Sequence, residues 1–327
     1  MASPIDPAAD IALGHYPPPR RTIIHLSDTH FLGTGDPLYG AVDTDAGLER
    51  ALTLVAGSGR EVAAIIITGD LTDLGEPAAY RRLRAMLEPA AARLGAELVW
   101  VMGNHDERPA FAAELLDLEP SLEPQDRVHW IGGLRIIALD TSVPGYHHGD
   151  LDRAQLDWLA VELATPAPEG TLVALHHPPV PSPVELMALL ELHNQTAFGQ
   201  VLEGSDVLAI LAGHLHHPMF GLFAGIPVSV ASATCYSIDS LAELGSLRGI
   251  DGARSLNLVE LRATGVTHTI VPVDAMSTIS GFPRETMELL ARMTPEARLD
   301  AFSRKRSAFG GSGTDSPGPG APSSPGA

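Results

Sequence analysis

The sequence predicts a layered α/β protein, and three observations support this prediction. Six short apolar runs, several of them rich in Ile and Val, are each followed by polar and often ionisable residues. Amphipathic stretches of helical length lie between some of these runs, and three more strand-like runs follow the sixth without a long helical pattern between them. Such alternation is typical of helices that pack on a sheet. A chain of 327 residues can form one large domain or two small ones.

The apolar runs are expected to be strands, because each is short and ends at polar or turn-forming residues. In chain order the first six are TIIHLSDTH (22–30), VAAIIITGD (62–70), AELVWVMGNHD (96–106), LRIIALDTS (134–142), TLVALHHPP (171–179) and VLAILAGHLHH (207–217). Three later runs are expected to pair mostly antiparallel and to complete a second sheet. They are IPVSVASATCY (226–236), SLNLVEL (255–261) and GVTHTIVPV (265–273).

Two stretches between the strands have helical periodicity and are expected to pack on the sheet. In residues 76–95 the apolar stripe consists of Tyr80, Leu83, Leu87, Ala90 and Leu94. In residues 153–164 the spacing i, i+3, i+4, i+7 is met by Leu156, Leu159, Ala160 and Leu163. A last amphipathic stretch, about 284–302, is also expected to be helical.

The ends of the chain differ in composition from its middle. Residues 1–20 contain several prolines and no apolar run, and residues 308–327 are a Gly/Ser/Pro mixture, so both segments are expected to be disordered. Between them we expect one folded domain over 21–275 and a helical extension over 276–307. No signal peptide and no apolar run of about 18 residues is found. We therefore expect a soluble, cytoplasmic protein.

Charge and cysteine content exclude several function classes. The formal net charge of −19 would repel a polyphosphate backbone, so stable nucleic-acid binding is not expected. Cys235 is the only cysteine, which excludes an intramolecular disulfide and a cysteine-rich metal site, and is compatible with a reducing compartment.

The chemistry-bearing residues gather where the predicted strands end. Functional groups of α/β sheets lie at such positions. The residues are Asp28, His30, Asp70, Asp73, Asn104, His105, Asp106, His176, His177, His214 and His216. One polar residue at a strand end is usually a cap or a turn former. Five strand ends that each carry a carboxylate, an amide or an imidazole favour instead a transition-metal site.

Pairs at spacing i, i+2 explain how one strand end could contribute two ligands. In extended backbone such residues point to the same side, so Asp28 with His30, and His214 with His216, are expected to reach one locus.

These residues resemble the signature of the calcineurin-like metallophosphoesterases, over about 22–272. The matching blocks are Asp28-x-His30, Gly69-Asp70-x-x-Asp73, Gly103-Asn104-His105-Asp106, His176 and Gly213-His214-x-His216. Within that superfamily the chain is most similar to bacterial class III cyclic nucleotide phosphodiesterases. This similarity lies in stretches such as HLSDTH, LYGAVD, GEPAAYRRLR, GAELVWVMGNHD, LDTSVPG, HHGDL, LHHPP and ILAGHLHH.

The resemblance implies a four-layer α/β/β/α sandwich of two mixed sheets that holds two metal ions. It implies that one ion is held by Asp28, His30 and His216, and the other by the set Asn104, His176 and His214. Asp70 would bridge both. The ions would come from Fe, Mn, Zn and Co, with an Fe–Mn pair favoured. A hydroxide between them would attack phosphorus in line, as in two-metal sites with ions about 3.5–4 Å apart.

The resemblance also implies roles for residues around the ions. His105 would contact a phosphoryl oxygen or protonate the leaving alkoxide. Asn104 and His147 would contact the substrate phosphate, His147 being favoured over its neighbour His148. Asp73 and Asp106 would orient the ligands or His105, and ordinary turn or capping roles for these two carboxylates stay open.

Charge counting favours a diester substrate. Two divalent ions with only Asp28 and Asp70 as anionic ligands leave a net charge of about +2, or about +1 with a bridging hydroxide. A phosphodiester monoanion matches this charge, whereas a monoester dianion would need further cationic side chains. Near the motifs, only Arg81 and Arg108 are candidates for that role. The leading hypothesis is hydrolysis of 3′,5′-cyclic AMP, and of other diesters, to the 5′-monophosphate.

Other hypotheses stay open at this point. The substrate could be a 2′,3′-cyclic nucleotide, a glycerophosphodiester or a phosphomonoester, or the chain could be a non-catalytic binding module of the same fold. The resemblance implies a homodimer. A weak contact with anionic lipid is a further hypothesis, based on the basic cluster Arg304, Lys305 and Arg306.

Overall fold

The structure is a computed structural model that describes residues 16–304. The predicted disordered tail, 308–327, lies outside the described residues, as do residues 1–15 of the predicted disordered N-terminal segment and Lys305 and Arg306. The described chain divides into two compact units. One comprises Pro19–Ala275, and the described part of the other comprises residues 16–18 and 276–304.

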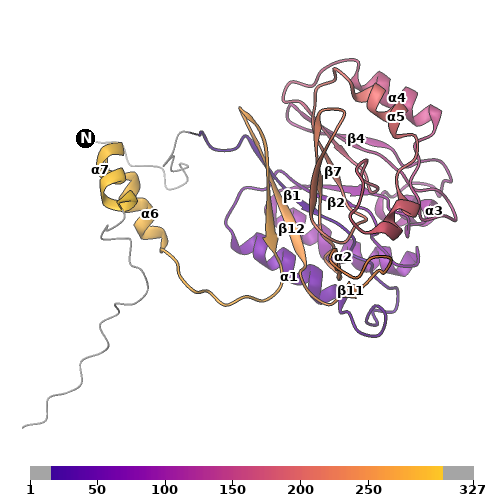
Figure 1. The fold of residues 1–327 in the computed structure, drawn as a ribbon, viewed down its shortest axis with the longest axis horizontal. Helices are drawn as coiled ribbons and strands as arrows, with labels where there is room; N and C mark the ends of the chain where they lie inside the picture. Colours follow the sequence, from indigo (N-terminus) through magenta and orange to yellow (C-terminus); the bar gives the residue numbers. More distant parts are fainter. Residues whose placement is uncertain (1–15, 305–327) are drawn as a thin grey trace, which may run out of the picture. The chain divides into compact units, whose positions relative to one another are not determined.

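The first sheet of the larger unit has five strands in the order β13-β12-β1-β2-β3 (Figure 1). Its strands are β1 (Arg21–Leu26), β2 (Ala64–Thr68), β3 (Glu97–Val101), β12 (Ser255–Arg262) and β13 (Gly265–Pro272). β1, β2 and β3 are parallel, while β12 runs antiparallel to β1 and β13 antiparallel to β12. The carboxyl ends of β1, β2 and β3 therefore meet at one edge of this sheet.

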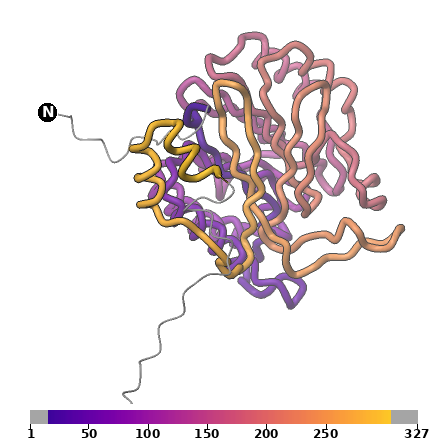
Figure 2. Tube along the Cα trace, turned by 60° about the vertical axis from the view of Figure 1, so that its left-hand side comes forward, coloured from indigo at the N-terminus to yellow at the C-terminus, as the bar shows by residue number. Residues whose placement is uncertain are grey.

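The second sheet has six strands in the order β4-β5-β6-β7-β9-β8. Its strands are β4 (Arg127–Ile131), β5 (Leu134–Ala138), β6 (Thr171–Ala174), β7 (Val207–Ala212), β8 (Met219–Phe223) and β9 (Ile226–Val230). The four inner strands are parallel, and β4 and β8 run antiparallel at the two edges. β10 (Ser237–Ile238) and β11 (Gly249–Ile250) form a separate short hairpin, which stands out from the rest of the unit in Figure 2.

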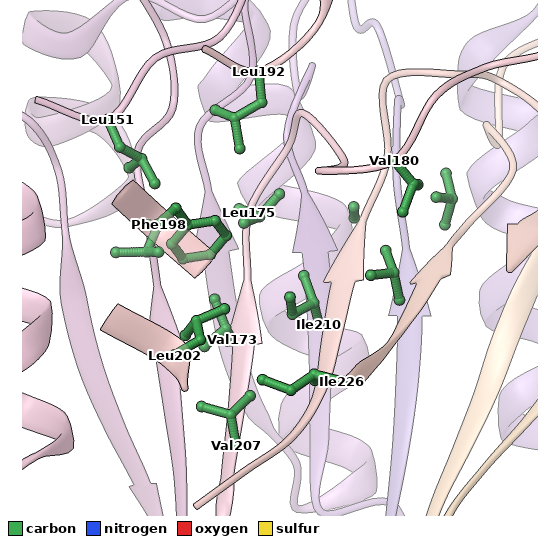
Figure 3. Packing of buried hydrophobic residues seen from close by; sticks show 14 of the residues in the cluster. Leu151, Val173, Leu175, Val180, Leu192, Phe198, Leu202, Val207, Ile210 and Ile226 are labelled. Carbon is green, nitrogen blue, oxygen red and sulfur yellow. The ribbon is translucent and has the colours of Figure 1, made fainter. Parts of the chain in front are cut away.

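Helices cover one face of each sheet, and the other faces pack against each other. α1 (Thr44–Gly57), α2 (Pro77–Leu94) and α3 (Arg108–Leu115) pack on the first sheet, through a core that includes Leu48, Leu83 and Phe111. α4 (Arg153–Leu163) and α5 (Gln195–Leu202) pack on the second, where Figure 3 shows Phe198 and Leu202 beside Val173. The core between the sheets contains Ile66 and Leu172. The predicted α/β fold with two mixed sheets in an α/β/β/α arrangement is confirmed.

Local sequence explains where the predicted helices begin and end. α2 begins with Pro77, whose missing N–H is not needed in the first turn, and ends at Gly95 with φ 66°, a left-handed conformation that suits glycine. α4 begins at a capping box formed by Asp152 and Gln155. The predicted stripes are buried except at their margins, where Leu94 is half-buried and Ala160 is exposed.

The assignment of strands to sheets corrects part of the sequence prediction. Of the three late strands, only β9 belongs to the second sheet, whereas β12 and β13 extend the first sheet beside β1. The strands β4 and β8 were not expected. Both lie at sheet edges, where RVHWI and MFGLF contain exposed residues and so lack the continuous apolar run of a central strand.

The smaller unit corrects the predicted helix over 284–302. It contains α6 (Arg284–Ala291), α7 (Pro295–Arg298) and a π-helical turn, Leu299–Ser303. The break lies where Thr294 caps α7 through its side chain and Pro295 starts a new first turn. Within residues 16–304, no helix is long and apolar enough to cross a membrane. The remaining short helix is the 3-10 helix Glu185–Leu190.

Candidate metal centre

The residues predicted as metal ligands come together at the carboxyl ends of strands from both sheets. In one group, ligand atoms of Asp28, His30, Asp70 and His216 all lie within 4.8 Å of one another. In a second group, His176 Nε2 lies 3.1 Å from Asn104 Oδ1 and 3.2 Å from His214 Nδ1. Asp70 lies between the groups, because its Oδ2 is 3.5 Å from His30 Nε2 and 3.3 Å from His176 Nε2.

The backbone brings these side chains together in a way that the sequence analysis did not anticipate. Asp28, His30, His214 and His216 were expected to converge from extended backbone, but their φ angles are 52°, 45°, 71° and 52°. Asp70 shares this left-handed conformation, with φ 47°. The chain therefore turns sharply at each of these five residues instead of continuing the strand. Non-glycine residues rarely adopt such angles, and they cluster at functional sites.

Two glycines before ligand residues allow the loops to approach closely. A Cβ on Gly103 would lie 2.2 Å from the backbone N of Asp70, and a Cβ on Gly213 would lie 1.8 Å from Ser27 Oγ. Because real Cβ atoms do not approach so closely, only glycine fits at these positions. The glycines of the Gly-Asn-His and Gly-His-x-His motifs thus serve the packing of the ligand loops.

The imidazoles of both groups have the orientation that is usual for metal-binding histidines. His30 Nδ1 donates to Asp73 Oδ1 (2.9 Å) and His216 Nδ1 to the Tyr236 carbonyl (3.1 Å), while their Nε2 atoms lie 3.1 Å apart. In the second group, His176 Nδ1 donates to the Thr68 carbonyl, and its Nε2 faces the centre. One ring nitrogen fixed by an acceptor and the other turned inward with its lone pair is the usual arrangement of metal-bound histidine.

His214 has the same arrangement with its ring reversed. Its Nε2 donates to the Leu190 carbonyl at 3.1 Å, and its Nδ1 faces His176. All four imidazoles therefore turn one ring nitrogen toward a centre that also contains buried carboxylates. The donor set of nitrogen and oxygen fits transition-metal ions. Nitrogen and oxygen atoms that suit such ions are present in both groups, on either side of Asp70.

The two buried aspartates are ionised. Burial alone would raise the pKa of Asp70, but the charge and hydrogen bond of His176, together with His30, hold it well below its usual value. Burial likewise opposes ionisation of Asp28, and His216 outweighs it, so the pKa of Asp28 is lowered. Asp28 and Asp70 thus provide two negative charges next to the inward-facing imidazoles.

Asn104, His105 and His147 form the more open side of the centre. The backbone N–H of His105 donates to Asp70 Oδ1 (2.9 Å), and its Nδ1 lies 2.9 Å from the Asp73 carbonyl oxygen. His147 Nδ1 lies 2.9 Å from Asn104 Nδ2, and its ring centroid is 4.9 Å from that of His105. Their roles toward a substrate stay predictions.

Asp73 and Asp106 have different surroundings, although both were predicted to orient other groups. Asp73 contacts His30 and His105 directly. Asp106 is buried and accepts hydrogen bonds from the backbone N–H groups of Leu71, Thr72 and Gly103 and from the Tyr80 hydroxyl. Asp106 thus joins the loop after β2 to the loop after β3, and acts on the ligands through the backbone.

We expect Asp106→Ala to lower the free energy of unfolding by about 3 kcal/mol, because it leaves several buried donors without an acceptor. Urea unfolding of the metal-free protein measures this change. Asp157→Ala, which removes an exposed partner of Arg153 in α4, is the matched control with an expected change within about 0.5 kcal/mol. Equal small changes in both variants would show that Asp106 does not hold the loops.

Several contributors to the centre were missed in the sequence. His177 Nε2 donates to the His147 carbonyl (3.2 Å) and its Nδ1 accepts from the Thr141 hydroxyl (2.7 Å), a structural role that fixes the loop carrying His147. The Leu190 and Tyr236 carbonyls have no sequence signal, because any residue provides one. Arg108 binds Asp140 and two carbonyls, so it is not a free cation beside the centre.

Arg81 is also engaged elsewhere. Its guanidinium pairs with Glu114 at 2.6 Å. His25 is a core histidine bonded to Thr68 Oγ1, and Cys235 is buried in a small apolar cluster.

Comparison with known proteins gives consistent results. A family model described as calcineurin-like phosphoesterase matches residues 21–218. The chain is 55% identical over 267 residues to the cAMP/cGMP dual specificity phosphodiesterase of Mycobacterium tuberculosis, a match that covers 82% of this chain and 84% of the relative. It is 49% identical over 279 residues to a probable cyclic nucleotide phosphodiesterase of Rhodococcus erythropolis, covering 85% and 92%.

The chain is also similar, at lower identity, to a phosphodiesterase named for another substrate and to a solved phosphatase structure. The chain is 27% identical over 221 residues to a glycerophosphodiester phosphodiesterase of Enterobacter lignolyticus, covering 66% of this chain and 78% of the relative. Among solved structures, a purple acid phosphatase from yellow lupin superposes with a TM-score of 0.51 at 12% identity, covering 77% of this chain and 51% of the other. At that identity the likeness is one of fold.

Proposed function

Because the chain belongs to the calcineurin-like phosphoesterase family, we propose that it hydrolyses cyclic nucleotides, 3′,5′-cyclic AMP foremost, to 5′-monophosphates. One observation carries this proposal. In each of four buried imidazoles one ring nitrogen is fixed by an acceptor, and the other is turned toward two ionised aspartates. The names of the two more similar relatives, both phosphodiesterases of cyclic nucleotides, support the substrate class.

The residues present fit two metal ions. We assign one to Asp28, His30 and His216, and the other to the second group, Asn104, His176 and His214, with Asp70 shared. Fe, Mn, Zn and Co are all compatible with these nitrogen and oxygen ligands, and an Fe–Mn pair is our proposal. When bound, such ions neutralise charge on the phosphoryl group and make water a nucleophile at neutral pH.

His105 is proposed to deliver the proton that the reaction needs at the leaving oxygen. Breaking the P–O3′ bond of a 3′,5′-cyclic nucleotide leaves an alkoxide on the ribose, which is a poor leaving group unless it is protonated. The Nδ1–H of His105 donates to the Asp73 carbonyl, and the Asp73 carboxylate lies 3.7 Å from the same nitrogen. These two contacts fix the ring through Nδ1, and Nε2 is the nitrogen that we propose protonates O3′.

Asn104 and His147 are proposed to orient the phosphate. The Asn104 amide is held between His176 on its oxygen side and His147 on its nitrogen side, so its plane is set. His147 is itself fixed through its carbonyl by His177. Two polar side chains with set positions can hold a phosphoryl oxygen for in-line displacement.

The charge of the site supports a diester. Asp28 and Asp70 are the anionic ligands, and the arginines nearest to the motifs in the sequence, Arg81 and Arg108, are bound to Glu114 and Asp140. A monoester dianion would therefore meet no additional guanidinium from these two residues. A diester monoanion requires none.

Substrate comparison on one metal-reconstituted preparation tests the function. We expect kcat/KM to be highest for 3′,5′-cyclic AMP or cyclic GMP, and lower for a 2′,3′-cyclic nucleotide, glycerophosphoethanolamine and p-nitrophenyl phosphate. A higher value for glycerophosphoethanolamine would assign the chain to the activity named for the Enterobacter relative. Metal-replete protein that cleaves none of these compounds would favour a binding module.

The finer assignments of partner and compartment are proposals as well. We propose that the protein is a homodimer. The net charge of −19 argues against stable nucleic-acid binding, and the single cysteine is consistent with the cytoplasm, which we propose as its compartment. Sedimentation analysis of the full chain decides the oligomeric state.

A further inference from the structure

An aromatic patch, formed by Tyr39 and Tyr236, lies beside the first ligand group. The ring of Tyr236 is 4.5 Å from the ring of His216 and 6.4 Å from that of His30, centroid to centroid. The ring of Tyr39 is 5.8 Å from Tyr236 and meets it edge to face. Tyr236 is half-buried, whereas Tyr39 is 70% exposed. The patch therefore begins at a metal ligand and ends at solvent.

The loop that carries Tyr39 is firmly anchored. Its neighbours Leu38 and Val42 are 1% and 6% exposed and pack with Ala233 and Cys235 in a small core of their own. Leu38 and Val42 also exchange backbone hydrogen bonds in both directions, at 2.8 and 3.0 Å. An exposed tyrosine between two buried anchors has a defined position, which a binding surface requires.

The backbone of Tyr39 is unusual for its residue type. Its φ is 53°, in the left-handed region that large side chains rarely adopt. The next residue, Gly40, is also left-handed, with φ 70°, so two successive left-handed residues form the tight turn between Leu38 and Val42. The turn thus fixes a large aromatic side chain at an exposed position.

We propose that Tyr39 and Tyr236 form the surface on which the base of the cyclic nucleotide stacks while its phosphate lies at the metal centre; this inference rests on the proposed function. Every base has a π-face, and stacking of bases on aromatic side chains is tolerant of base identity. The surface would therefore accept adenine and guanine alike. Tyr39 is the residue to test, because the ring and carbonyl of Tyr236 both contact the ligand His216.

A second aromatic group on the opposite ligand side is less suited to this role. Tyr146 lies 5.3 Å from His148, and His148 stacks on His193 at 4.4 Å. Among the ring contacts of the described residues, these three make none with a metal-ligand imidazole. Tyr146 is 63% exposed, close to the value for Tyr39, so it provides a matched control.

The test compares substrates that differ only in the base. Wild-type, Tyr39→Phe, Tyr39→Ala and Tyr146→Ala proteins are loaded with metal and assayed with 3′,5′-cyclic AMP, 3′,5′-cyclic GMP and the abasic 1-deoxyribose 3,5-cyclic phosphate. For Tyr39→Ala we expect KM for both nucleotides to rise about tenfold, and the ratio of kcat/KM for cyclic AMP over the abasic compound to fall by the same factor. Tyr39→Phe keeps the ring and should keep the ratio.

Each outcome distinguishes this inference from the proposed function. If wild type hydrolyses cyclic AMP and Tyr39→Ala leaves the ratio unchanged, the base does not stack here and the function stands. A fall of the ratio in Tyr146→Ala alone would place the base on the other side and overturn the proposal. A wild-type protein inert toward both cyclic nucleotides would overturn the function and this inference together.

Discussion

Asp70→Ala is expected to remove bound metal and phosphodiesterase activity together, lowering kcat/KM by more than about 1,000-fold. Asp70 is the carboxylate that lies within 3.5 Å of ligand nitrogens from both groups, at His30 and His176. Its loss leaves buried imidazoles facing one another without the shared anion. Removal of a group that merely supports a ligand typically costs about 10- to 100-fold, so loss of a shared ligand should cost more.

The measurement combines elemental analysis with steady-state kinetics on the same samples. Asp70→Asn accompanies the alanine variant, because asparagine has the same size and tolerates the left-handed backbone at φ 47° while lacking the charge. Asp157→Ala, which alters an exposed pair in α4, should keep both metal and activity. An Asp70 variant that folds, retains two ions and cleaves cyclic AMP at the wild-type rate would refute the assigned ligand set.

Asn104→Ala extends the same argument to the second group. Asn104 Oδ1 is an uncharged candidate ligand atom 3.1 Å from His176 Nε2, so metal at this group should be lost before metal at the first group. We expect about one ion per chain to be retained and activity to be lost. Full activity of this variant would contradict the assignment.

His105→Ala is expected to lower kcat for cyclic AMP by about 100- to 10,000-fold while metal content stays unchanged. His105 contributes its backbone N–H, not its side chain, to Asp70, so the alanine variant keeps that contact. What is lost is the ring that Asp73 holds beside the centre. The loss should therefore fall on turnover and not on metal binding.

The leaving group separates the two roles considered for His105. Nitrophenolate leaves without protonation, whereas a ribose alkoxide does not, so a proton donor predicts a much smaller effect on bis(p-nitrophenyl) phosphate than on cyclic AMP. Equal losses on both substrates would indicate that His105 binds a phosphoryl oxygen instead. His148→Ala serves as the control, since the ring of His148 contacts only Tyr146 and His193 among the described rings.

The sequence was informative where the type of a residue indicates whether that residue is buried or exposed. The apolar stripe Tyr80, Leu83 and Leu87 identified α2, because periodic burial follows from the helix geometry alone. The polar residues after the apolar runs marked the edge at which the parallel strands end. Their order along the chain was also sufficient to recognise the family resemblance that the comparison with known proteins confirmed.

Tertiary structure decided the features that depend on distant partners. The residues of an apolar strand such as β12 do not indicate which sheet the strand will join. Its place beside β1 depends on the packing of both sheets. The left-handed turns at Asp28 and His214 depend on loops from different strands meeting at close range. The Leu190 and Tyr236 carbonyls that orient two ligand histidines are common to every residue type, so only the folded backbone could identify them.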